Sequence, residues 1–146
     1  MPRIERTADI VWEGSVARGA GRITSDSGAL ADLPFSLPSR IARQEGKTSP
    51  EELLAAAHGG CLTTSVATEL GVAGTPPTRI DTTVRIVMDE VAGEGHQIIG
   101  SQVKIRVEAE GADEQAIAAA IERADAGCPF STLLRKAGVQ VSIDRG

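Results

Sequence analysis

The sequence predicts an α+β fold with antiparallel sheet, and three observations support this class. Apolar and polar residues alternate at the start of the chain and again beyond residue 78, as in half-buried strands. A long stretch almost free of charge, residues 49–70, lies between these segments and begins with helix signals. The expected order is three strands, a helix, two strands, two helices and a strand, which is typical of α+β proteins. At 146 residues we expect a single domain, residues 1–146.

The first strands are expected within residues 7–30, TADIVWEGSVARGAGRITSDSGAL, where alternation is interrupted by glycine-containing turns. This pattern predicts two or three strands in a hairpin or meander. A short strand is expected to include Phe35 and Leu37. The polar residues 40–47, RIARQEGK, predict a loop.

The central helix has a clear start. Ser49 suits the N-cap, Pro50 suits the first helical position, and Glu52 completes an S-x-x-E capping box. From residue 53 to residue 68 the only ionisable side chains are His58 and Cys61, and apolar residues fall on every face. We therefore expect this helix to be buried centrally. It is too short and too rich in Gly, Ser and Thr for a membrane span, and residues 71–78 end it.

Residues 79–92 and 97–109 alternate again and predict a long antiparallel hairpin, with His96 in its glycine-containing turn and exposed to solvent. Asp113 then caps a helix that ends near Gly127. A short helix over residues 129–136 and a last strand, VQVSID, complete the chain.

The composition narrows the classes of function. The net charge is −5 with both signs mixed along the chain and no basic run, which argues against nucleic acid or an anionic membrane as partner. A neutral or mildly anionic small molecule fits better. The N-terminal residues carry no secretory signal, so we expect a cytoplasmic protein whose cysteines are reduced at rest.

The chain has only two cysteines, Cys61 and Cys128, and each allows two interpretations. Cys61 is either an inert core residue or a reactive thiolate, and a thiolate in mid-helix needs a cation, for which Arg40 and Arg43 are the best-placed candidates. Cys128 is near the N-cap of a helix, where unpaired N–H groups favour a thiolate, or it is a cap or core residue. Two such cysteines raise the possibility of a dithiol couple.

Other residues of the central helix suggest further hypotheses. His58 lies three residues before Cys61 on the same helix face, which leaves a Cys–His hydrolase as an alternative to a buried core histidine. No pair of histidines and cysteines has a recognised zinc-ligand spacing, so we predict no metal site. Gly59 and Gly60 suggest close approach by another backbone. A helix this apolar also suggests that a second subunit packs on it in a C₂ dimer.

Three segments are specific enough to compare with known families: SPEELLAAAHGGC, the later AGCPFS, and the opening VWEGSVARGAGRITSDSGAL. Together they resemble the OsmC/Ohr family of osmotically inducible and organic-hydroperoxide-resistance proteins, and look closer to the OsmC branch. The resemblance implies an OsmC/Ohr-like fold with antiparallel sheets around a long buried helix, in an intertwined homodimer. It also implies a peroxidase that reduces organic hydroperoxides in osmotic and oxidative stress.

On the family pattern, Cys61 matches the peroxidatic thiolate, Cys128 the resolving thiol, Arg40 the activating arginine and Glu51 the carboxylate that positions it. Arg43 remains a fallback for Arg40, and His58 matches no catalytic role. The family implies an external dithiol reductant, of lipoyl type, rather than a bound cofactor. The alternative function is a peroxide or electrophile sensor, or a hydrophobic-ligand binding protein, without turnover.

The spacing of two of these residues bears on the expected dimer. Glu51 and Cys61 are ten residues apart, roughly 15 Å along one helix, which is too far for joint action within one chain. We therefore expect Glu51 and Arg40 to serve the Cys61 of the other subunit.

Overall fold

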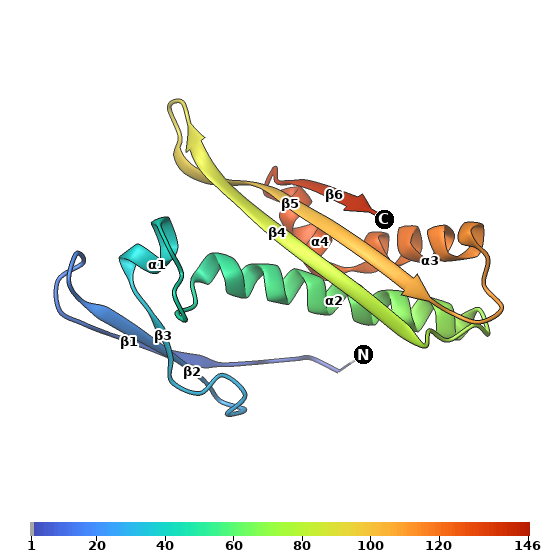
Figure 1. The fold of residues 1–146 in the computed structure, drawn as a ribbon, viewed down its shortest axis with the longest axis horizontal. Coiled ribbons are helices and arrows are strands. Elements are labelled where there is room, and N and C mark those ends of the chain that lie inside the picture. Colours follow the sequence, from blue (N-terminus) through green and yellow to red (C-terminus); the bar gives the residue numbers. More distant parts are fainter. Residues whose placement is uncertain (1) are drawn as a thin grey trace. The chain divides into compact units, whose positions relative to one another are not determined.

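The computed structural model describes residues 2–146 and has the predicted α+β class (Figure 1). The chain forms two compact units, one ending at Leu53 and the other running from Leu54 to Gly146. Each unit is described by itself below.

The first unit holds a small antiparallel sheet of β1 (Ala8–Glu13), β2 (Ala20–Ser25) and β3 (Leu33–Phe35), in that order. The register pairs Ala8 with Ser25 and Glu13 with Ala20, which confirms the predicted hairpin. All six residues of β1 are exposed. No residue of β1 is therefore buried in a hydrophobic core within this chain.

The predicted loop over residues 40–47 is wrong at its start, because Arg40 lies in a helix, α1 (Leu37–Ile41). This helix begins at a capping box in which the Ser36 hydroxyl accepts the Ser39 N–H at 3.3 Å and the Ser39 hydroxyl accepts the Ser36 N–H at 2.9 Å. Pro38 lies in the first turn, where its missing N–H costs nothing. The same box removes Leu37 from the expected strand.

The long helix α2 (Pro50–Val72) begins where the sequence predicts. The Ser49 hydroxyl accepts the Glu52 N–H at 3.1 Å, which confirms Ser49 as N-cap, whereas the Glu52 carboxylate accepts the Thr48 hydroxyl at 3.0 Å. The buried residues of α2 are spaced four apart and so form one stripe: His58, Leu62, Val66 and Leu70. Within this chain burial is thus confined to one face of α2. No helix among residues 2–146 is long and apolar enough to cross a membrane.

The second unit has a three-stranded sheet in the order β4 (Arg79–Val91), β5 (Gly95–Glu108) and β6 (Gln140–Asp144). β4 and β5 form the predicted antiparallel hairpin, with an irregularity between Val87 and Met88. β6 pairs in parallel with β5, which departs from the expected all-antiparallel sheet. Parallel pairing needs a crossover, and the two helices between β5 and β6 provide it.

Those helices are α3 (Glu114–Gly127) and α4 (Pro129–Lys136), with Asp113 and Cys128 as their N-caps, as the sequence predicts. On β5, Val103 and Ile105 are buried while the alternate residues are exposed, so one face of the sheet is covered. Figure 1 shows the helices of this unit lying along that sheet. The core cluster joins α2, β5, α3 and Cys128, and its members are Leu62, Val66, Leu70, Val103, Ile105, Ala120, Ile121, Ala124 and Cys128.

Candidate active site

The two cysteines lie side by side in the second unit. Cys61, in the middle of α2, accepts a hydrogen bond from the thiol of Cys128, and the two sulfur atoms are 3.2 Å apart. Cys128 is fully buried, Cys61 is half-buried, and both are free thiols. A disulfide has an S–S distance of about 2.05 Å, so a small movement of the two side chains is enough to form one.

The first turn of α4 points N–H groups at both sulfur atoms. The Ser131 N–H donates to Cys128 Sγ at 3.5 Å, which is the N-cap interaction of this helix. The backbone of Phe130 hydrogen-bonds Cys61 and lowers the pKa of its thiol. Helix N-termini favour negative charge, so the Phe130 backbone favours a thiolate at Cys61.

Burial opposes that effect at Cys61 and is the largest influence on its pKa. Burial raises the pKa of the Cys61 thiol, and the hydrogen bond and charge of Cys128 raise it further. The Phe130 backbone and the Ser65 hydroxyl lower it, but the net shift is upward. None of these groups carries a positive charge. Cys61 therefore needs a cation from elsewhere before it can react as a thiolate.

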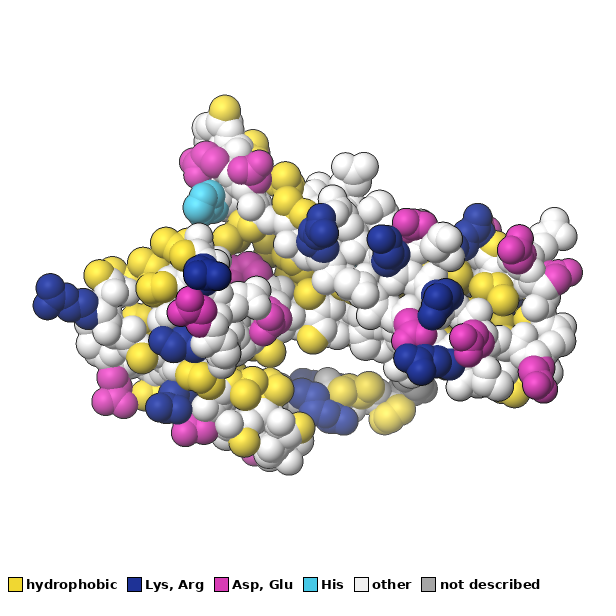
Figure 2. Space-filling model, in the orientation of Figure 1, with side chains coloured by type: hydrophobic (Ala, Val, Ile, Leu, Met, Phe, Trp, Pro, Cys, Tyr) yellow, Lys and Arg dark blue, Asp and Glu magenta, His cyan; other side chains and the backbone are white. Residues whose placement is uncertain are grey.

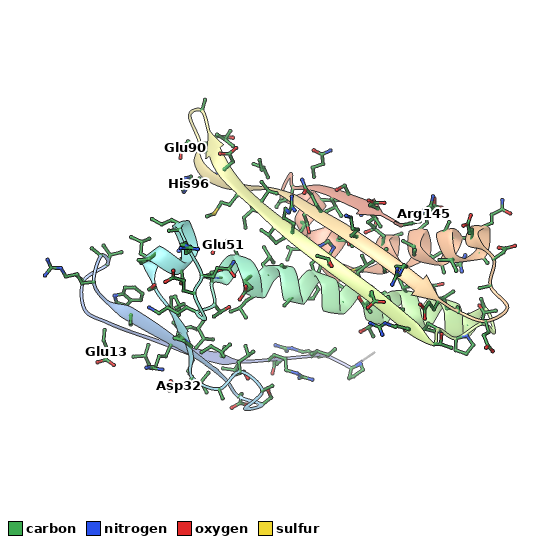
Figure 3. All side chains as sticks on the ribbon, in the orientation of Figure 1. Glu13, Asp32, Glu51, Glu90, His96 and Arg145 are labelled. Carbon is green, nitrogen blue, oxygen red and sulfur yellow. The ribbon has the colours of Figure 1, made fainter. Side chains whose placement is uncertain are left out.

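Arg40 and Glu51 form an ion pair in the first unit. The Arg40 Nη2 donates to Glu51 Oε1 at 2.6 Å, and its Nε donates to the same oxygen at 3.2 Å. Burial raises the pKa of Glu51, yet the hydrogen bonds and charge of Arg40 and the backbone outweigh it, so the pKa lies below the ordinary value. Figure 3 shows Glu51 at the start of α2. This carboxylate fixes the plane and direction of the guanidinium.

Arg43, the alternative arginine, has a different environment. Its side chain is 88% exposed, and its Nε lies 3.8 Å from Glu45 Oε1. The two residues are close in sequence and on the surface, where such a pair contributes little. Between the two candidates, Arg40 is the arginine held in a defined geometry.

A small apolar pocket of about 190 Å³ lies next to Arg40 within the first unit. It is lined by Trp12, Val16, Phe35, Ser36, Leu37 and Arg40. The rings of Trp12 and Phe35 are 5.7 Å apart between centroids and tilted by 52°. A pocket with apolar walls and one cation suits the organic part of a ligand whose polar end bonds the guanidinium.

His58 is fully buried in the second unit, and serine hydroxyls take both of its ring nitrogens. Nδ1 lies 2.6 Å from Ser101 Oγ on β5, and Nε2 lies 2.8 Å from Ser131 Oγ on α4. Burial is the main reason why the pKa of His58 lies below its ordinary value, so the ring is neutral at pH 7. With both nitrogens occupied, His58 is not available as a base for Cys61, which argues against the hydrolase hypothesis.

The second histidine lies outside this site. The His96 side chain is exposed, as predicted, and its Nε2 lies 3.3 Å from Glu90 Oε2. Figure 3 shows both residues near the turn of the long hairpin.

The paired glycines of α2 are explained only in part. A Cβ on Gly59 would lie 3.0 Å from Cγ2 of Val84, so the close approach at this glycine is by a side chain of β4 rather than by a backbone. A Cβ on Gly60 would meet open space in this chain.

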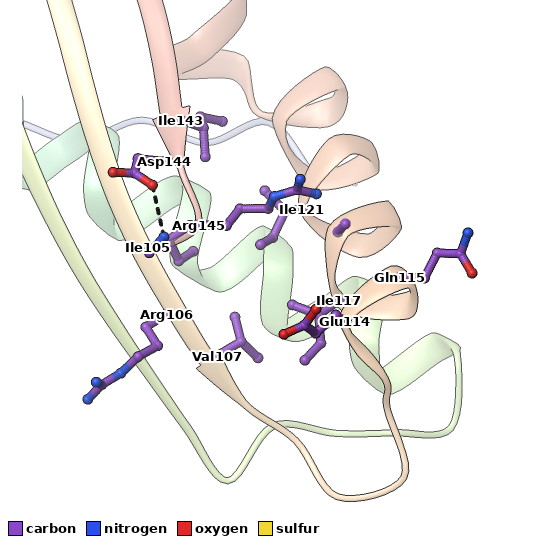
Figure 4. Close-up of a pocket in the computed structure, with 12 residues that line it drawn as sticks. Ile105, Arg106, Val107, Glu114, Gln115, Ile117, Ile121, Ile143, Asp144 and Arg145 are labelled. Atoms are coloured by element: carbon purple, nitrogen blue, oxygen red, sulfur yellow. Dashed lines mark hydrogen bonds between the residues drawn. The ribbon is translucent and has the colours of Figure 1, made fainter.

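A larger groove lies away from the cysteines, between α3 and the end of the sheet (Figure 4). Its volume is about 960 Å³, and its walls mix isoleucines such as Ile117 and Ile143 with charged residues such as Arg106 and Glu114. It contains neither thiol and no histidine.

Two features of these sites are not apparent from the sequence, the pocket beside Arg40 and the contact of Ser131. The sequence places Trp12 and Phe35 only in expected strands, because their spacing from Arg40 gives no signal of a shared pocket. Ser131 gave no signal, because its partner His58 lies 73 positions away in the sequence.

Comparison with known proteins gives concordant matches. The model of the OsmC-like protein family matches residues 43–144. A curated relative, peroxiredoxin OsmC of Escherichia coli (strain K12), is 36% identical over 141 residues, which cover 97% of this chain and 95% of that protein.

Two solved structures share the fold. An organic hydroperoxide resistance protein OsmC from Legionella pneumophila has a TM-score of 0.77 at 19% identity, with 99% of each chain covered. The organic hydroperoxide resistance protein OhrB of Bacillus subtilis has a TM-score of 0.74 at 23% identity, with 96% of this chain and 98% of that chain covered.

Proposed function

The chain belongs to the OsmC-like protein family, and on this premise we propose that it is a thiol-dependent peroxidase that reduces organic hydroperoxides to alcohols. The observation that carries the proposal is the pair of free thiols, Cys61 and Cys128, with sulfur atoms 3.2 Å apart. A peroxidatic cysteine needs a resolving partner within reach, and this pair supplies one.

The first step uses the Cys61 thiolate, which attacks the terminal oxygen of the hydroperoxide. The S–O bond forms, the O–O bond breaks, and the alkoxide leaves as an alcohol after taking a proton, so Cys61 becomes a sulfenic acid. Arg40, oriented by Glu51, stabilises the thiolate and hydrogen-bonds the peroxide oxygens as negative charge moves to the leaving group.

The second step regenerates a stable form. The Cys128 sulfur attacks the Cys61 sulfur of the sulfenic acid, the S–S bond forms, the S–O bond breaks, and water leaves with the thiol proton of Cys128. The Ser131 N–H, which already donates to Cys128 Sγ, supports the attacking thiolate. An external dithiol of lipoyl type then reduces the disulfide by exchange. The reducing environment that this needs fits a cytoplasmic protein.

The apolar pocket beside Arg40 supports an organic substrate. Its walls offer Trp12, Phe35 and Leu37 to a hydrocarbon group, whereas hydrogen peroxide has no such group to bury. The substrate class is therefore an alkyl or aryl hydroperoxide.

We also propose that the active form is a homodimer in which Arg40 of one copy serves Cys61 of the other. Cys61 has no cation among the groups that set its pKa, and α2 is covered on only one face. Figure 2 shows apolar side chains on the surface of the chain, and the exposed ones include Ile10, Val11 and Trp12 of β1. A second copy is the simplest cover for such surfaces.

The experiment treats the fully reduced protein with one equivalent of cumene hydroperoxide and measures intact mass and free thiols. We expect loss of two hydrogens and of both thiols within one chain. The Cys61→Ser variant should leave the peroxide and Cys128 unchanged, and the Cys128→Ser variant should stop at a Cys61 sulfenic acid that dimedone traps. Unchanged thiols in the wild-type protein would overturn the proposal.

Repeated turnover separates the enzyme from a sensor. With excess dihydrolipoamide, the wild-type protein should consume many equivalents of hydroperoxide. A sensor or a binding protein would consume one equivalent or none.

A further inference from the structure

Two contacts join α2 and α4, one helical turn apart. His58 Nε2 lies 2.8 Å from Ser131 Oγ, and Cys61 Sγ lies 3.2 Å from Cys128 Sγ. The two positions differ by three residues on each side: 58 and 61 lie on α2, whereas 128 is the N-cap of α4 and 131 lies in its first turn. The pairing is reversed in order, so the helices run in opposite directions where they meet. The histidine–serine contact thus neighbours the thiol pair on both helices.

We propose that His58 is a positioning residue for disulfide formation, which it promotes by holding the first turn of α4, through Ser131, at the distance from α2 that Cys128 needs to attack Cys61. The inference rests on the proposed peroxidase function and adds a role that the mechanism above does not use.

The contacts of Ser131 connect the histidine to the attacking sulfur. The Ser131 hydroxyl bonds His58, and the Ser131 N–H donates to Cys128 Sγ at 3.5 Å. One residue therefore carries both the link to α2 and an N–H donor to the Cys128 sulfur. A shift of its backbone moves the sulfur and its stabilising donor together.

A contact between His58 and Ser101 gives the imidazole ring a fixed orientation. Ser101 on β5 is fully buried and lies 2.6 Å from His58 Nδ1, so the imidazole is held at both ends. A neutral imidazole has one donor and one acceptor nitrogen, and hydroxyl groups can satisfy either. Three buried polar groups from α2, β5 and α4 thus hydrogen-bond one another.

A mere core role for His58 makes a different prediction. Filling the core needs only volume, which an apolar side chain supplies, whereas positioning needs the hydrogen bond to Ser131. Displacements of about 1 Å can slow a reaction between two groups by roughly a hundredfold. The rate of disulfide formation therefore distinguishes the two roles even where both variants fold.

The test compares His58→Gln with His58→Leu. The terminal amide of glutamine lies near the place of Nε2 and keeps the bond to Ser131, whereas leucine keeps volume and loses the bond. Each reduced protein is mixed rapidly with one equivalent of cumene hydroperoxide and quenched at intervals with a thiol-blocking reagent. Intact mass then gives the sulfenic acid, the disulfide and the sulfinic acid separately. Thermal melting of both variants and the wild type reports whether they fold.

We expect His58→Leu to form the disulfide roughly tenfold more slowly than wild type, and His58→Gln to remain within about threefold. With excess hydroperoxide, His58→Leu should accumulate the Cys61 sulfinic acid, because the slower disulfide leaves the sulfenic acid open to a second oxidation by the peroxide. Ser131→Ala, which removes the other side of the bond, should behave like His58→Leu.

Three outcomes overturn the inference: equal disulfide rates in the wild type and His58→Leu, loss of rate in His58→Gln equal to that in His58→Leu, or a wild-type rate in Ser131→Ala. If His58→Leu does not fold, the comparison uses Ser131→Ala and His58→Gln alone. A wild-type rate in Ser131→Ala, or a rate in His58→Gln as slow as in Ser131→Ala, then overturns the inference. Failure of the wild-type protein itself to form a sulfenic acid or a disulfide would overturn the proposed function instead.

Discussion

At the scale of single residues, the proposed chemistry divides between two charged side chains, Arg40 and Glu51, and two sulfur side chains, Cys61 and Cys128. Glu51 orients the Arg40 side chain, because its Oε1 accepts hydrogen bonds from Arg40 Nη2 at 2.6 Å and from Arg40 Nε at 3.2 Å. Cys61 owes its raised pKa mainly to burial, so the surroundings that exclude water from the thiol also favour its protonated form. In the proposed mechanism, the positive charge of Arg40 lowers the pKa of Cys61 and so opposes the effect of burial.

Replacement of Glu51 tests whether orientation of the arginine matters. Glu51→Gln removes the charge that binds Arg40 and should lower kcat/KM for cumene hydroperoxide roughly tenfold or more, because the guanidinium no longer has a fixed position. Steady-state kinetics with dihydrolipoamide measure it. The control is Glu52→Gln in the same turn, which keeps an acceptor for Thr48 and should retain near wild-type activity. Equal losses in both variants would contradict the role of Glu51.

His58 should make the folded protein sensitive to acid. Burial lowers its pKa, with Arg135 lowering it and Asp125 raising it, so the folded chain resists a proton that the unfolded chain accepts. Below about pH 6.5 the unfolded state therefore gains a proton, and stability falls as pH falls toward the lowered pKa.

Urea unfolding at about pH 7.5 and about pH 5.5 measures this effect. The wild-type protein should lose more unfolding free energy between these values than His58→Gln does, by at most about 1.4 kcal/mol, since the other titrating groups are common to both. An equal loss in the two proteins would show that His58 does not contribute.

At the scale of elements, short capped helices place the reactive groups. α1 carries Arg40 and starts at the Ser36–Ser39 capping box, and α4 carries Cys128 as its own N-cap. In each case a few local hydrogen bonds hold a side chain of the proposed site. On the proposed function, capping at α1 and α4 should affect activity, whereas the Asp113 cap of α3 should affect stability alone.

Two cap variants separate these contributions. Ser36→Ala and Asp113→Ala each remove an N-cap hydrogen bond and should each cost about 1 kcal/mol of stability. Only Ser36→Ala should also lower peroxidase activity, because α1 positions Arg40. Urea unfolding and kcat/KM are measured on both variants. Similar activities in the two would show that the start of α1 is not needed to place Arg40.

At the scale of the whole molecule, the single chain leaves apolar surface uncovered and Cys61 without a cation. β1 is exposed along its length, α2 is buried along one stripe, and Gly60 meets open space. These features share one explanation in the proposed homodimer, in which each copy supplies Arg40 to the other.

Mixing two inactive variants tests the exchange of Arg40 between copies. Cys61→Ser and Arg40→Ala are expected to be inactive alone. Co-expressed at equal levels, they should form mixed dimers in which one site has both residues, and activity should return to about a quarter of wild type, since half of the dimers are mixed and each has one complete site. Absence of rescue, with mixed dimers demonstrated by native mass spectrometry, would mean that Arg40 acts within its own chain.

The sequence by itself determined the features that depend on neighbouring residues. The caps at Ser49, Asp113 and Cys128 were predicted because N-cap chemistry is local, and the long hairpin was predicted because alternation shows directly which face is buried. The family resemblance followed from motifs spread along nearly the whole chain. The helix over residues 37–41 was missed, although its Ser-x-x-Ser cap was present, because serine at the fourth position is a weaker signal than glutamate.

Only the tertiary structure decided which distant residues meet. Cys61 and Cys128 are 67 positions apart, and neither their contact nor the bonds of His58 to Ser101 and Ser131 can be read from spacing. The parallel pairing of β6 also depended on where two helices return the chain. Such contacts arise from packing of whole elements, because a side chain's long-range partner is set by how helix and sheet faces cover one another.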